Sequence, residues 1–255
     1  MVLAALASTG FAAAGVHAMR LRARPQLRLH VAGMRIALTF GVVAALLQPL
    51  SGDLSAKSVA ERQPLKLAAM ESHFHTESGA GLWVGGIPDM KERTVNYGVQ
   101  IPHALSFLAY ADPHAEVRGL EDFPEEDWPP VVVCHLAFQV MVMMGMGMAG
   151  VGTLYLGLRW RRPKLIEHPW FLGLVAAATP LGFVAVEAGW IVTEVGRQPW
   201  IIYGVMRTSE ALTPMPGLWV PLTISLTVYA LLSALSVAVF WRQIRAVEEA
   251  EARHG

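Results

Sequence analysis

Apolar and charged segments alternate along the chain, and five of the apolar ones are long. An α-helix rises about 1.5 Å per residue, so about 20 apolar residues cross the roughly 30 Å hydrocarbon core of a bilayer. The second segment approaches that length if it begins near Val31. The pattern predicts an all-α, polytopic membrane helix bundle. Its five transmembrane helices cover approximately Val2–Met19, Ile36–Leu50, Val131–Leu158, Phe171–Val195 and Gly217–Trp241.

The first apolar segment has one feature of a secretory signal peptide, because Val16-His17-Ala18 resembles a cleavage site. A signal peptide also carries positive charge before its apolar run. The segment has no basic residue there, so we favour a membrane span.

Basic residues are concentrated in three connectors: RLRARPQLRLH at 20–30, RWRRPKLIEH at 159–168 and WRQIR at 241–245. With five spans, all three connectors fall on one side of the membrane. The positive-inside rule makes that side cytoplasmic. We therefore expect the loops at 51–130 and 196–216 to be extracytoplasmic. The N-terminus is expected on the same side. The long loop is acidic, with 13 Asp and Glu against 6 Lys and Arg.

Composition agrees with a membrane protein, since 54% of the residues are hydrophobic and 16% are charged, against about 25% charged in soluble domains. The formal net charge is zero, so no nucleic-acid partner is expected. The single cysteine, Cys134, excludes an intrachain disulfide. The expected organisation is two transmembrane helices in 1–50, the loop in 51–130, three transmembrane helices in 131–241 and a cytoplasmic tail in 242–255.

The long loop contains enough pattern to be organised. Lys57 to His75 is rich in helix formers and predicts a helix. The glycines of GAGLWVGGIPD indicate tight turns. The apolar stretch VNYGVQIPHALSFLAY is expected to pack on the membrane surface or on the helix ends, and GLEDFPEEDWPP forms an acidic entry to the third span. Loops above about 15 residues in compact proteins are usually functional or disordered, and we favour a functional loop.

Histidines in the sequence allow a chemical and a structural interpretation. His73, His75 and Glu77 could bind a metal, but no further matched ligands follow, so surface polar residues are favoured. His17 and His135 lie in predicted spans, where a heme ligand is one interpretation and a packed or hydrogen-bonded histidine is the favoured one. The methionine-rich VMVMMGMGMAG is, taken alone, adaptable helix packing.

Two carboxylates interrupt the fourth span. Glu187 and Glu194 are seven residues apart and therefore share one helix face with Trp190, while Pro180 is expected to kink the helix below them. Arg197 follows as a charge partner for a carboxylate or an anionic cofactor group. A carboxylate within a membrane span is costly. The stripe indicates a proton path or a buried cofactor site in preference to a purely structural ion pair.

Several motifs together resemble a known family. GWIVTEVGRQPW resembles a signature of cytochrome bd ubiquinol oxidase subunit I, and QPLKLAAMESHF is similar to the opening of its quinol-binding loop. GIPD, QIPHAL and FQVMVMMG follow the family's order. The resemblance covers essentially the whole chain, as the last five of the family's nine helices. It implies part of a quinol:dioxygen oxidoreductase in the bacterial cytoplasmic membrane, which oxidises quinol and reduces dioxygen to water through hemes.

The resemblance implies roles for particular residues. Met141 matches the methionine ligand of a low-spin heme b, and Glu194 matches the carboxylate ligand of a high-spin heme b. Arg197 is similar to an arginine among the heme propionates, and Trp190 to an aromatic residue beside the high-spin hemes. A third heme, heme d or a second high-spin heme b, is also implied. Glu187 is a hypothetical proton relay, which is our own suggestion and not a family property.

Lys66 and Glu71 match a pair implicated in quinol oxidation. Five residues apart on a regular helix, they point about 140° away from each other, so a shared pocket would require an irregular backbone or a ligand held at two ends. Gln139 stands where many family members carry arginine.

The resemblance begins after the family's first four helices, which hold the histidine ligand of its heme d, and the histidine ligand of its low-spin heme lies about where Met1 begins. We expect a gene started late at an internal Met, a subunit split between two chains, or a degenerate fragment, and favour the first. The implied partners are oxidase subunit II, a separate chain carrying the four helices and a small single-helix subunit. The alternative function is a non-catalytic membrane scaffold or truncated remnant. A transporter is disfavoured because no internal repeat is found.

Overall fold

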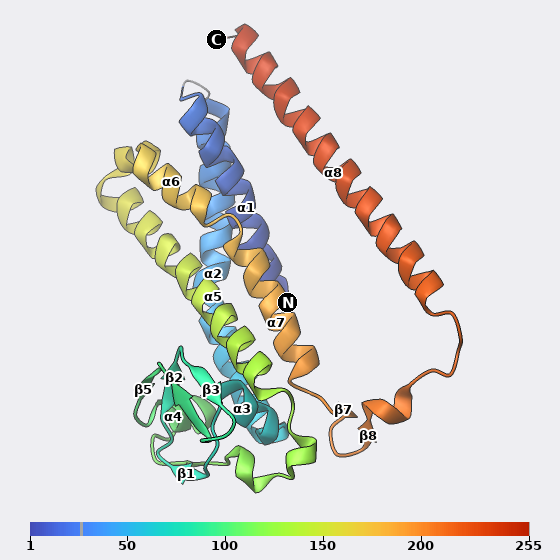
Figure 1. The fold of residues 1–255 in the computed structure, drawn as a ribbon. Helices are drawn as coiled ribbons and strands as arrows, with labels where there is room; N and C mark the ends of the chain where they lie inside the picture. Colours follow the sequence, from blue (N-terminus) through green and yellow to red (C-terminus); the bar gives the residue numbers. More distant parts are fainter. Residues whose placement is uncertain (26–27, 255) are drawn as a thin grey trace.

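The computed structural model describes residues 1–25 and 28–254. It is a helix bundle with a small lobe at one end and a long helix beside it (Figure 1). Within the described residues, five helical segments are long and apolar enough to cross a membrane, which confirms the predicted bundle. The helices are α1 Val2–Ala23, α2 Arg28–Arg62, α5 Val131–Arg161, α6 Pro169–Ala177 with α7 Leu181–Val195, and α8 Trp219–His254.

The second span is longer than expected. Helix α2 begins at Arg28 and continues without interruption to Arg62, with Pro49 inside it. The interval 51–130 therefore begins inside a helix that extends beyond the length of a span. The same holds for the tail, because α8 continues past Trp241 to His254.

The prediction of one helix from Lys57 to His75 was wrong. The helix breaks at Gln63, and α3 then covers Pro64–Glu71. Proline lacks an N–H to donate and disfavours helical backbone in the residue before it. Gln63 accordingly has φ −140° and ψ 62°. Helix α3 ends because Ser72 adopts left-handed backbone, with φ 50°.

The fourth span is also broken, at Pro180, where the sequence predicts only a kink. Helix α6 ends at Ala177 and α7 begins at Leu181. The segment between them is tied by turn hydrogen bonds, including one from the N–H of Leu181 to the carbonyl of Ala178. The break lies deep in the span, so α7 with its carboxylates is a separate helix.

The bundle core forms where α1 packs on α2 and α6 and where α5 packs on α2 and α7. Two glycines allow a close approach of α1 and α2, because a Cβ on Gly10 would lie 2.6 Å from Cα of Gly41. Small residues at such crossings let membrane helices approach closely. Large side chains fill the rest of the core, among them Phe11, Met34, Leu38, Tyr155 and Phe171.

The lobe is built from short antiparallel pairs. Strand β1 (Glu77–Ser78) pairs with β6 (Glu116–Val117), β2 (Leu82–Val84) with β5 (Val99–Ile101), and β3 (Ile87–Asp89) with β4 (Thr94–Asn96). Gly86 has φ +97° in the turn between β2 and β3, and a Cβ there would lie 2.4 Å from the Val95 side chain. The turn requires glycine on both grounds. The short helices that complete the lobe are α4 (Ala104–Tyr110), η1 (Leu120–Asp122) and η2 (Glu125–Asp127).

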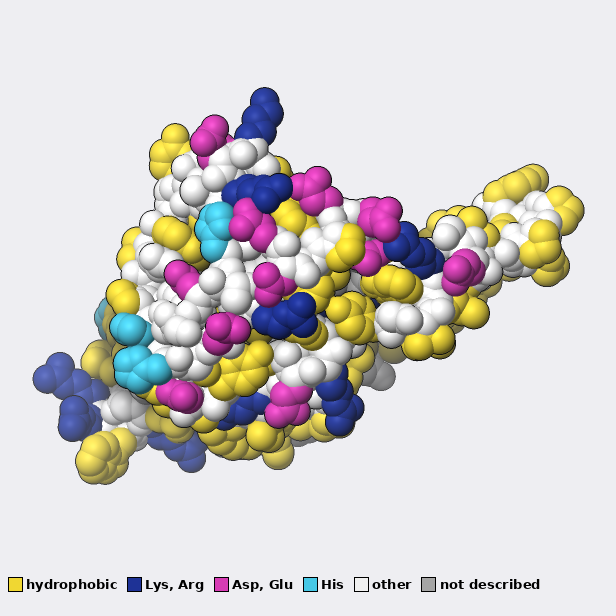
Figure 2. Space-filling view, turned by 90° about the horizontal axis from the view of Figure 1, so that it is seen from below, with side chains coloured by type: hydrophobic (Ala, Val, Ile, Leu, Met, Phe, Trp, Pro, Cys, Tyr) yellow, Lys and Arg dark blue, Asp and Glu magenta, His cyan; other side chains and the backbone are white. Residues whose placement is uncertain are grey.

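The lobe is held to the helix ends. Leu105 and Ala109 of α4 are buried in a cluster with Ala60 of α2 and Leu67 of α3. The apolar stretch that contains α4 therefore packs on helix ends, one of the two placements the sequence predicts. Viewed from this end, the surface carries several Asp and Glu side chains, interspersed with Lys, Arg and His and with hydrophobic and other atoms (Figure 2).

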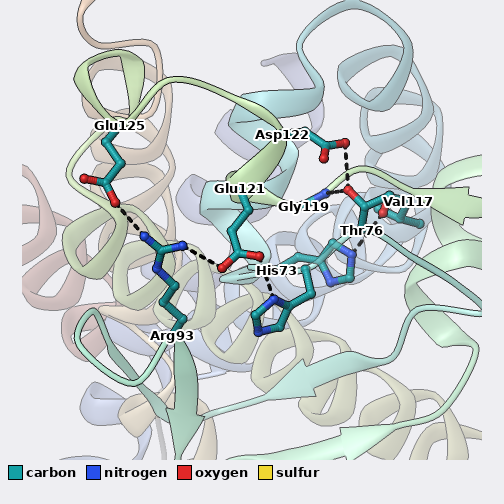
Figure 3. A network of polar contacts seen from close by, with 9 residues as sticks. His73, Thr76, Arg93, Val117, Gly119, Glu121, Asp122 and Glu125 are labelled. Atoms are coloured by element: carbon teal, nitrogen blue, oxygen red, sulfur yellow. Dashed lines mark hydrogen bonds and ion pairs between the residues drawn. The ribbon is translucent and has the colours of Figure 1, made fainter.

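A polar network crosses the outer face of the lobe. Arg93 donates hydrogen bonds to Glu121 and Glu125, both at 2.6 Å, and His75 Nδ1 lies 2.8 Å from Glu121 (Figure 3). Hydrogen bonds from Arg93 and His75 hold the pKa of Glu121 below its usual value. His73 is buried and its Nε2 lies 3.1 Å from the Val117 carbonyl, so the expectation that it is a surface residue was wrong.

The basic connectors gather at the opposite end. Glu167 in η3 (Pro163–Glu167) accepts a hydrogen bond from Arg35 at 2.8 Å and lies 3.7 Å from Arg28. Arg20 stacks over the Trp241 ring at 4.6 Å, which places the end of the fifth span at this end too. Figure 1 shows this end at the top, away from the lobe. The charge separation predicted from the sequence is therefore present in the fold.

Helix α8 stands apart from the other helices over most of its length (Figure 1). None of its most apolar 18-residue window is buried. The connection to it contains β7 (Trp200–Ile202) paired with β8 (Met206–Arg207), followed by η4 (Thr208–Ala211). A single apolar helix without a packed face requires lipid or other protein around it.

Candidate functional site

The polar stripe of α7 lies on the outside of the bundle. Trp190 is 63% exposed, Glu187 is exposed and Glu194 is partly exposed. The opposite side of the helix is buried, at Gly182, Ala188 and Val192. The predicted stripe therefore faces away from the described residues, as a surface that takes a large cofactor must.

The C-terminal end of the stripe carries an ion pair. Arg197 donates to Glu194 from just beyond the end of α7, as the sequence predicts. Both side chains remain about 40% exposed, at 41% and 40%. The carboxylate and the guanidinium therefore stay accessible to further ligands. Glu187 makes no hydrogen bond or ion pair within the part of the chain that the structure describes, and nothing in its surroundings supports the relay role.

Met141 on α5 is directed at the same helix. A Cβ added to Gly189 would lie 3.0 Å from the Met141 sulfur. The thioether thus contacts α7 at the residue next to Trp190. The structure therefore places Met141 against α7 at Gly189, while Trp190 and Glu194 lie on the exposed side of the same helix.

A cavity of about 250 Å³ lies beside this end of α7. The side chain of Lys66 borders it, and its Nζ donates to the Thr193 carbonyl at 3.4 Å. Burial lowers the pKa of Lys66 from its ordinary value. The lining comes from α3, from the end of α7 and from the segment after it: Gln63, Leu65, Lys66, Pro129, Thr193, Gly196, Arg197, Gln198, Trp200, Ile201 and Tyr203.

Glu71 does not line this cavity. Its side chain is 4% exposed, and Oε2 has no hydrogen-bond partner among the described residues. Burial raises the pKa of Glu71 to about 8. Because α3 is a regular helix, Lys66 and Glu71 face different sides, and the spacing argument excludes a shared pocket in this conformation.

Aromatic residues of the cavity were missed in the sequence. Trp200 and Tyr203 follow the GRQP segment and border the cavity beside Lys66 and Arg197. Thr208 fixes their segment by donating hydrogen bonds to Gln198 Oε1 and to the Pro199 carbonyl. Their nearness to the arginine in sequence was the available signal, but only the fold brings them to α3.

Gln139 has a role that its sequence position did not predict. Its Oε1 accepts a hydrogen bond from the Gly85 N–H at 3.0 Å, and its Nε2 donates to the Trp83 carbonyl at 2.8 Å. The side-chain amide thus pairs with the backbone as a neighbouring strand would. An arginine has no acceptor for the Gly85 N–H.

The Gln139→Leu variant is expected to loosen the β2–β3 turn. It leaves two partly buried backbone groups unpaired, at a cost of about 1–3 kcal/mol for each unsatisfied group. We expect faster limited proteolysis near Gly85 and unchanged proteolysis elsewhere in the lobe. Equal protection in Gln139→Leu and in the unmodified protein would show that the pairing does not hold the turn.

Each of the two histidines considered as heme ligands makes a protein contact through Nδ1, and His135 Nε2 is buried without a partner among the described residues. His17 Nδ1 lies 2.9 Å from His30 Nδ1, and His135 Nδ1 donates to the Met70 carbonyl at 2.9 Å. The described residues contain no group of three or more His, Cys, Asp and Glu side chains placed to hold a metal ion.

Met141, Glu194 and Arg197 each offer a chemical group that suits a heme. A thioether is a known axial ligand of heme iron, and carboxylate oxygen is a common iron ligand. Met141 and Glu194 offer these groups beside an exposed tryptophan, and Arg197 offers a guanidinium suited to carboxylates such as propionates. The outward face of α7 leaves room for a large planar group against Trp190.

Comparisons with known proteins all match the chain to one family. The sequence profile for cytochrome bd terminal oxidase subunit I matches residues 1–248. The chain is 38% identical over 94% of its length to a putative cytochrome bd menaquinol oxidase subunit I of Bacillus subtilis (strain 168). It is 32% identical over its full length to the cytochrome bd ubiquinol oxidase subunit 1 of the same organism.

A solved structure agrees with these relatives. The bd oxidase from Geobacillus thermodenitrificans superposes with a TM-score of 0.84 at 37% identity over 95% of this chain. The chain spans 55% and 57% of the two Bacillus proteins and 56% of the solved chain. The fold and the sequence together show that this chain belongs to the cytochrome bd terminal oxidase subunit I family.

Proposed function

We propose that this chain forms part of the heme-bearing subunit of a bd-type terminal oxidase, which oxidises membrane quinol and reduces dioxygen to water. The observation that carries the proposal is the cavity between Lys66 and Arg197 at the end of the α7 stripe. This cavity would place the quinol ring next to the α7 face that is proposed to hold heme. The names of the relatives, a menaquinol and a ubiquinol oxidase, agree with this chemistry.

The quinol headgroup is proposed to enter the cavity. Lys66 supplies a charged hydrogen-bond donor, and Trp200 and Tyr203 supply apolar area for an aromatic ring. Glu71 is proposed to accept protons from behind α3, because its buried carboxyl has a pKa near 8 and is therefore a stronger base than an ordinary glutamate.

The α7 face is proposed to hold heme. Met141 would ligate a low-spin heme b and Glu194 a high-spin heme b, with Arg197 at propionates and Trp190 beside the high-spin group. Heme d or a second high-spin heme b completes the set. When bound, these groups supply one-electron transfer and dioxygen chemistry. The protein residues position them and exclude water from the apolar face.

The remaining part of the site is proposed to come from elsewhere, since the chain spans just over half of its relatives' length. Four further helices, supplied by a longer form of the chain or by a separate chain, are proposed to pack on it. Oxidase subunit II and a small single-helix subunit are the other proposed partners. The unpacked α8 is available for such contacts.

We further propose the orientation in the bacterial cytoplasmic membrane. The gathered basic connectors and the end of α8 face the cytoplasm, and the acidic lobe faces outward, as the positive-inside rule requires. The cavity then opens on the outer side, where quinol oxidation would release protons outside.

Heme extraction tests the function. A C-terminally tagged copy is purified from its own host's membranes, and the hemes are identified and counted per tagged chain. We expect low-spin and high-spin hemes in the stoichiometry of a complete oxidase, with quinol-dependent oxygen uptake. A chain purified without heme would overturn the oxidase proposal and leave the scaffold as its function.

The Lys66→Met variant is expected to weaken quinol binding. Losing one charged hydrogen-bond donor in the cavity costs about 1.5–3 kcal/mol, so KM should rise roughly tenfold or more with little change in kcat. Steady-state oxygen uptake over a range of quinol concentrations measures this. Lys57→Met, at a partly exposed ion pair with Asp53, is the matched control, and equal KM values in both variants would contradict the assignment.

A further inference from the structure

A second cavity lies at the other end of the bundle from the lobe. It has a volume of about 480 Å³ and is formed by α2, α5 and η3. None of the residues assigned to quinol or heme borders it. The lining consists of two arginines, two hydroxyl-bearing side chains and four apolar ones: Arg35, Ile36, Thr39, Phe40, Tyr155, Arg159, Pro163 and Ile166.

The apolar part of this cavity continues onto the membrane face of α2. Ile36 is 61% exposed and Phe40 is 66% exposed. Both lie within a predicted span, so in the membrane they face hydrocarbon. A ligand here must therefore have an apolar body that continues into the bilayer.

The polar part lies at headgroup level. Arg159 is in the last turn of α5, and Arg35 is in the second turn of α2. Arg159 donates to the Tyr155 hydroxyl at 2.9 Å and has no carboxylate partner among the described residues. Its guanidinium is thus held in place by a neutral group and keeps its charge for a ligand.

Arg35 has spare capacity as well. One of its terminal nitrogens donates to Glu167 at 2.8 Å, but its Nε is buried and has no partner within the described chain. Glu167 is shared with Arg28, at 3.7 Å. Two arginines therefore share one carboxylate and Arg159 has none in the described part of the chain, so the positive charge at the cavity exceeds the negative charge and favours an anion.

We propose that this cavity binds the headgroup of an anionic phospholipid. The phosphate would lie between Arg35 and Arg159, and the acyl chains would follow Ile36 and Phe40 along α2. Arginine recognises phosphate through paired donors. Basic pockets between membrane helices on the cytoplasmic side bind anionic lipid headgroups in the same way.

The site has a structural consequence, because it joins elements that are distant in sequence. Arg35 and Arg159 belong to α2 and α5, and Pro163 and Ile166 belong to the connector between α5 and α6. A bound headgroup would offset the repulsion between the two arginines. The lipid is thus expected to hold the connector against α2.

Lipid retention tests the proposal. The complex is purified from its own host's membranes and incubated with mixed micelles of phosphatidylglycerol and phosphatidylcholine, and native mass spectrometry then measures retained lipid. Wild-type complex is expected to retain phosphatidylglycerol in preference to phosphatidylcholine. Arg159→Gln should lower that retention roughly five- to tenfold, since one charged contact is lost.

Two variants separate the site from general charge effects. Arg161→Gln removes a charge two residues away that does not line the cavity, and should change retention by less than about twofold. Glu167→Gln removes the competing carboxylate and should increase retention, a gain that damaged folding would not produce.

Three results would overturn the proposal. Equal losses in Arg159→Gln and Arg161→Gln would show attraction by the surface as a whole. Equal retention of both lipids would show an apolar groove without recognition of net charge. Displacement of phosphatidylglycerol by inorganic phosphate alone would identify a free-anion site. None of these readouts depends on heme or turnover, so failure here is distinguishable from failure of the proposed function.

Discussion

The Glu71→Gln variant is expected to lose up to about 10²-fold in quinol oxidation while it keeps its hemes, the lower end of the range for a general base, because Glu71 does not border the quinol cavity and would accept the proton indirectly. Glutamine preserves the size of the side chain but cannot accept a proton. Because Glu71 does not border the cavity that contains Lys66, the loss should appear in kcat and leave KM nearly unchanged. Oxygen uptake with quinol as donor, together with heme spectra of the same preparation, measures this.

The pH profile gives a second readout of the same variant. With a pKa of about 8, the Glu71 carboxylate is populated only as pH rises through that value. Quinol oxidation by the unmodified complex should therefore have a rising limb near pH 8, and Glu71→Gln should lack it. Glu77→Gln, at an exposed position in β1, is the control. An unchanged rising limb in Glu71→Gln would remove Glu71 from the reaction.

As pH rises, the folding stability that Glu71 contributes should fall, whereas quinol oxidation should rise. The folded-state pKa of Glu71 is raised above its ordinary 4.5 to about 8, so the folded lobe binds more protons than the unfolded chain between these values. Stability from the neutral carboxyl is present below about pH 4.5 and is lost as pH rises through about 8. Glu71→Gln should thus have a higher Tm than the unmodified protein above pH 8, with the difference shrinking toward acid. A pH-independent difference in Tm would contradict this.

The spans were predictable because each depends on local sequence. Length and apolar composition identify a membrane helix without tertiary information, and the proline signals at Pro64 and Pro180 act on neighbouring backbone. Pro180 was used to predict a kink, and the structure has a complete break between two helices at that position. Pro64 was passed over in favour of helix propensity, and the prediction of one continuous helix failed at Gln63.

The site was predictable only in part, for a related reason. The stripe of Glu187, Trp190 and Glu194 follows from helix periodicity, and the divergence of Lys66 and Glu71 follows from it as well. The pairing of Gln139 with Gly85 does not, because it joins residues whose separation in sequence carries no periodic signal. The cavity beside Lys66 likewise exists only after the segment beyond α7 returns to α3.

The Met141→Leu variant is expected to lose the low-spin heme b or to convert it to a high-spin species, with loss of quinol oxidase activity. Leucine has nearly the same volume, so the contact with Gly189 on α7 survives, but it has no atom that can ligate iron. The reduced-minus-oxidised difference spectrum and the pyridine hemochrome of the purified complex measure the change. Loss of the low-spin band with retention of the chlorin or other high-spin bands is the expected pattern.

Met143→Leu is the matched control, since Met143 is on the same helix and 59% exposed, away from the contact with Gly189. Thioether ligation raises the potential of a heme, so any low-spin heme that remains in Met141→Leu should have a lower midpoint potential and accept electrons from quinol less readily. A Met141→Leu complex with an unchanged low-spin spectrum and midpoint potential would show that Met141 only packs against α7. The low-spin heme would then have to be ligated by residues other than Met141.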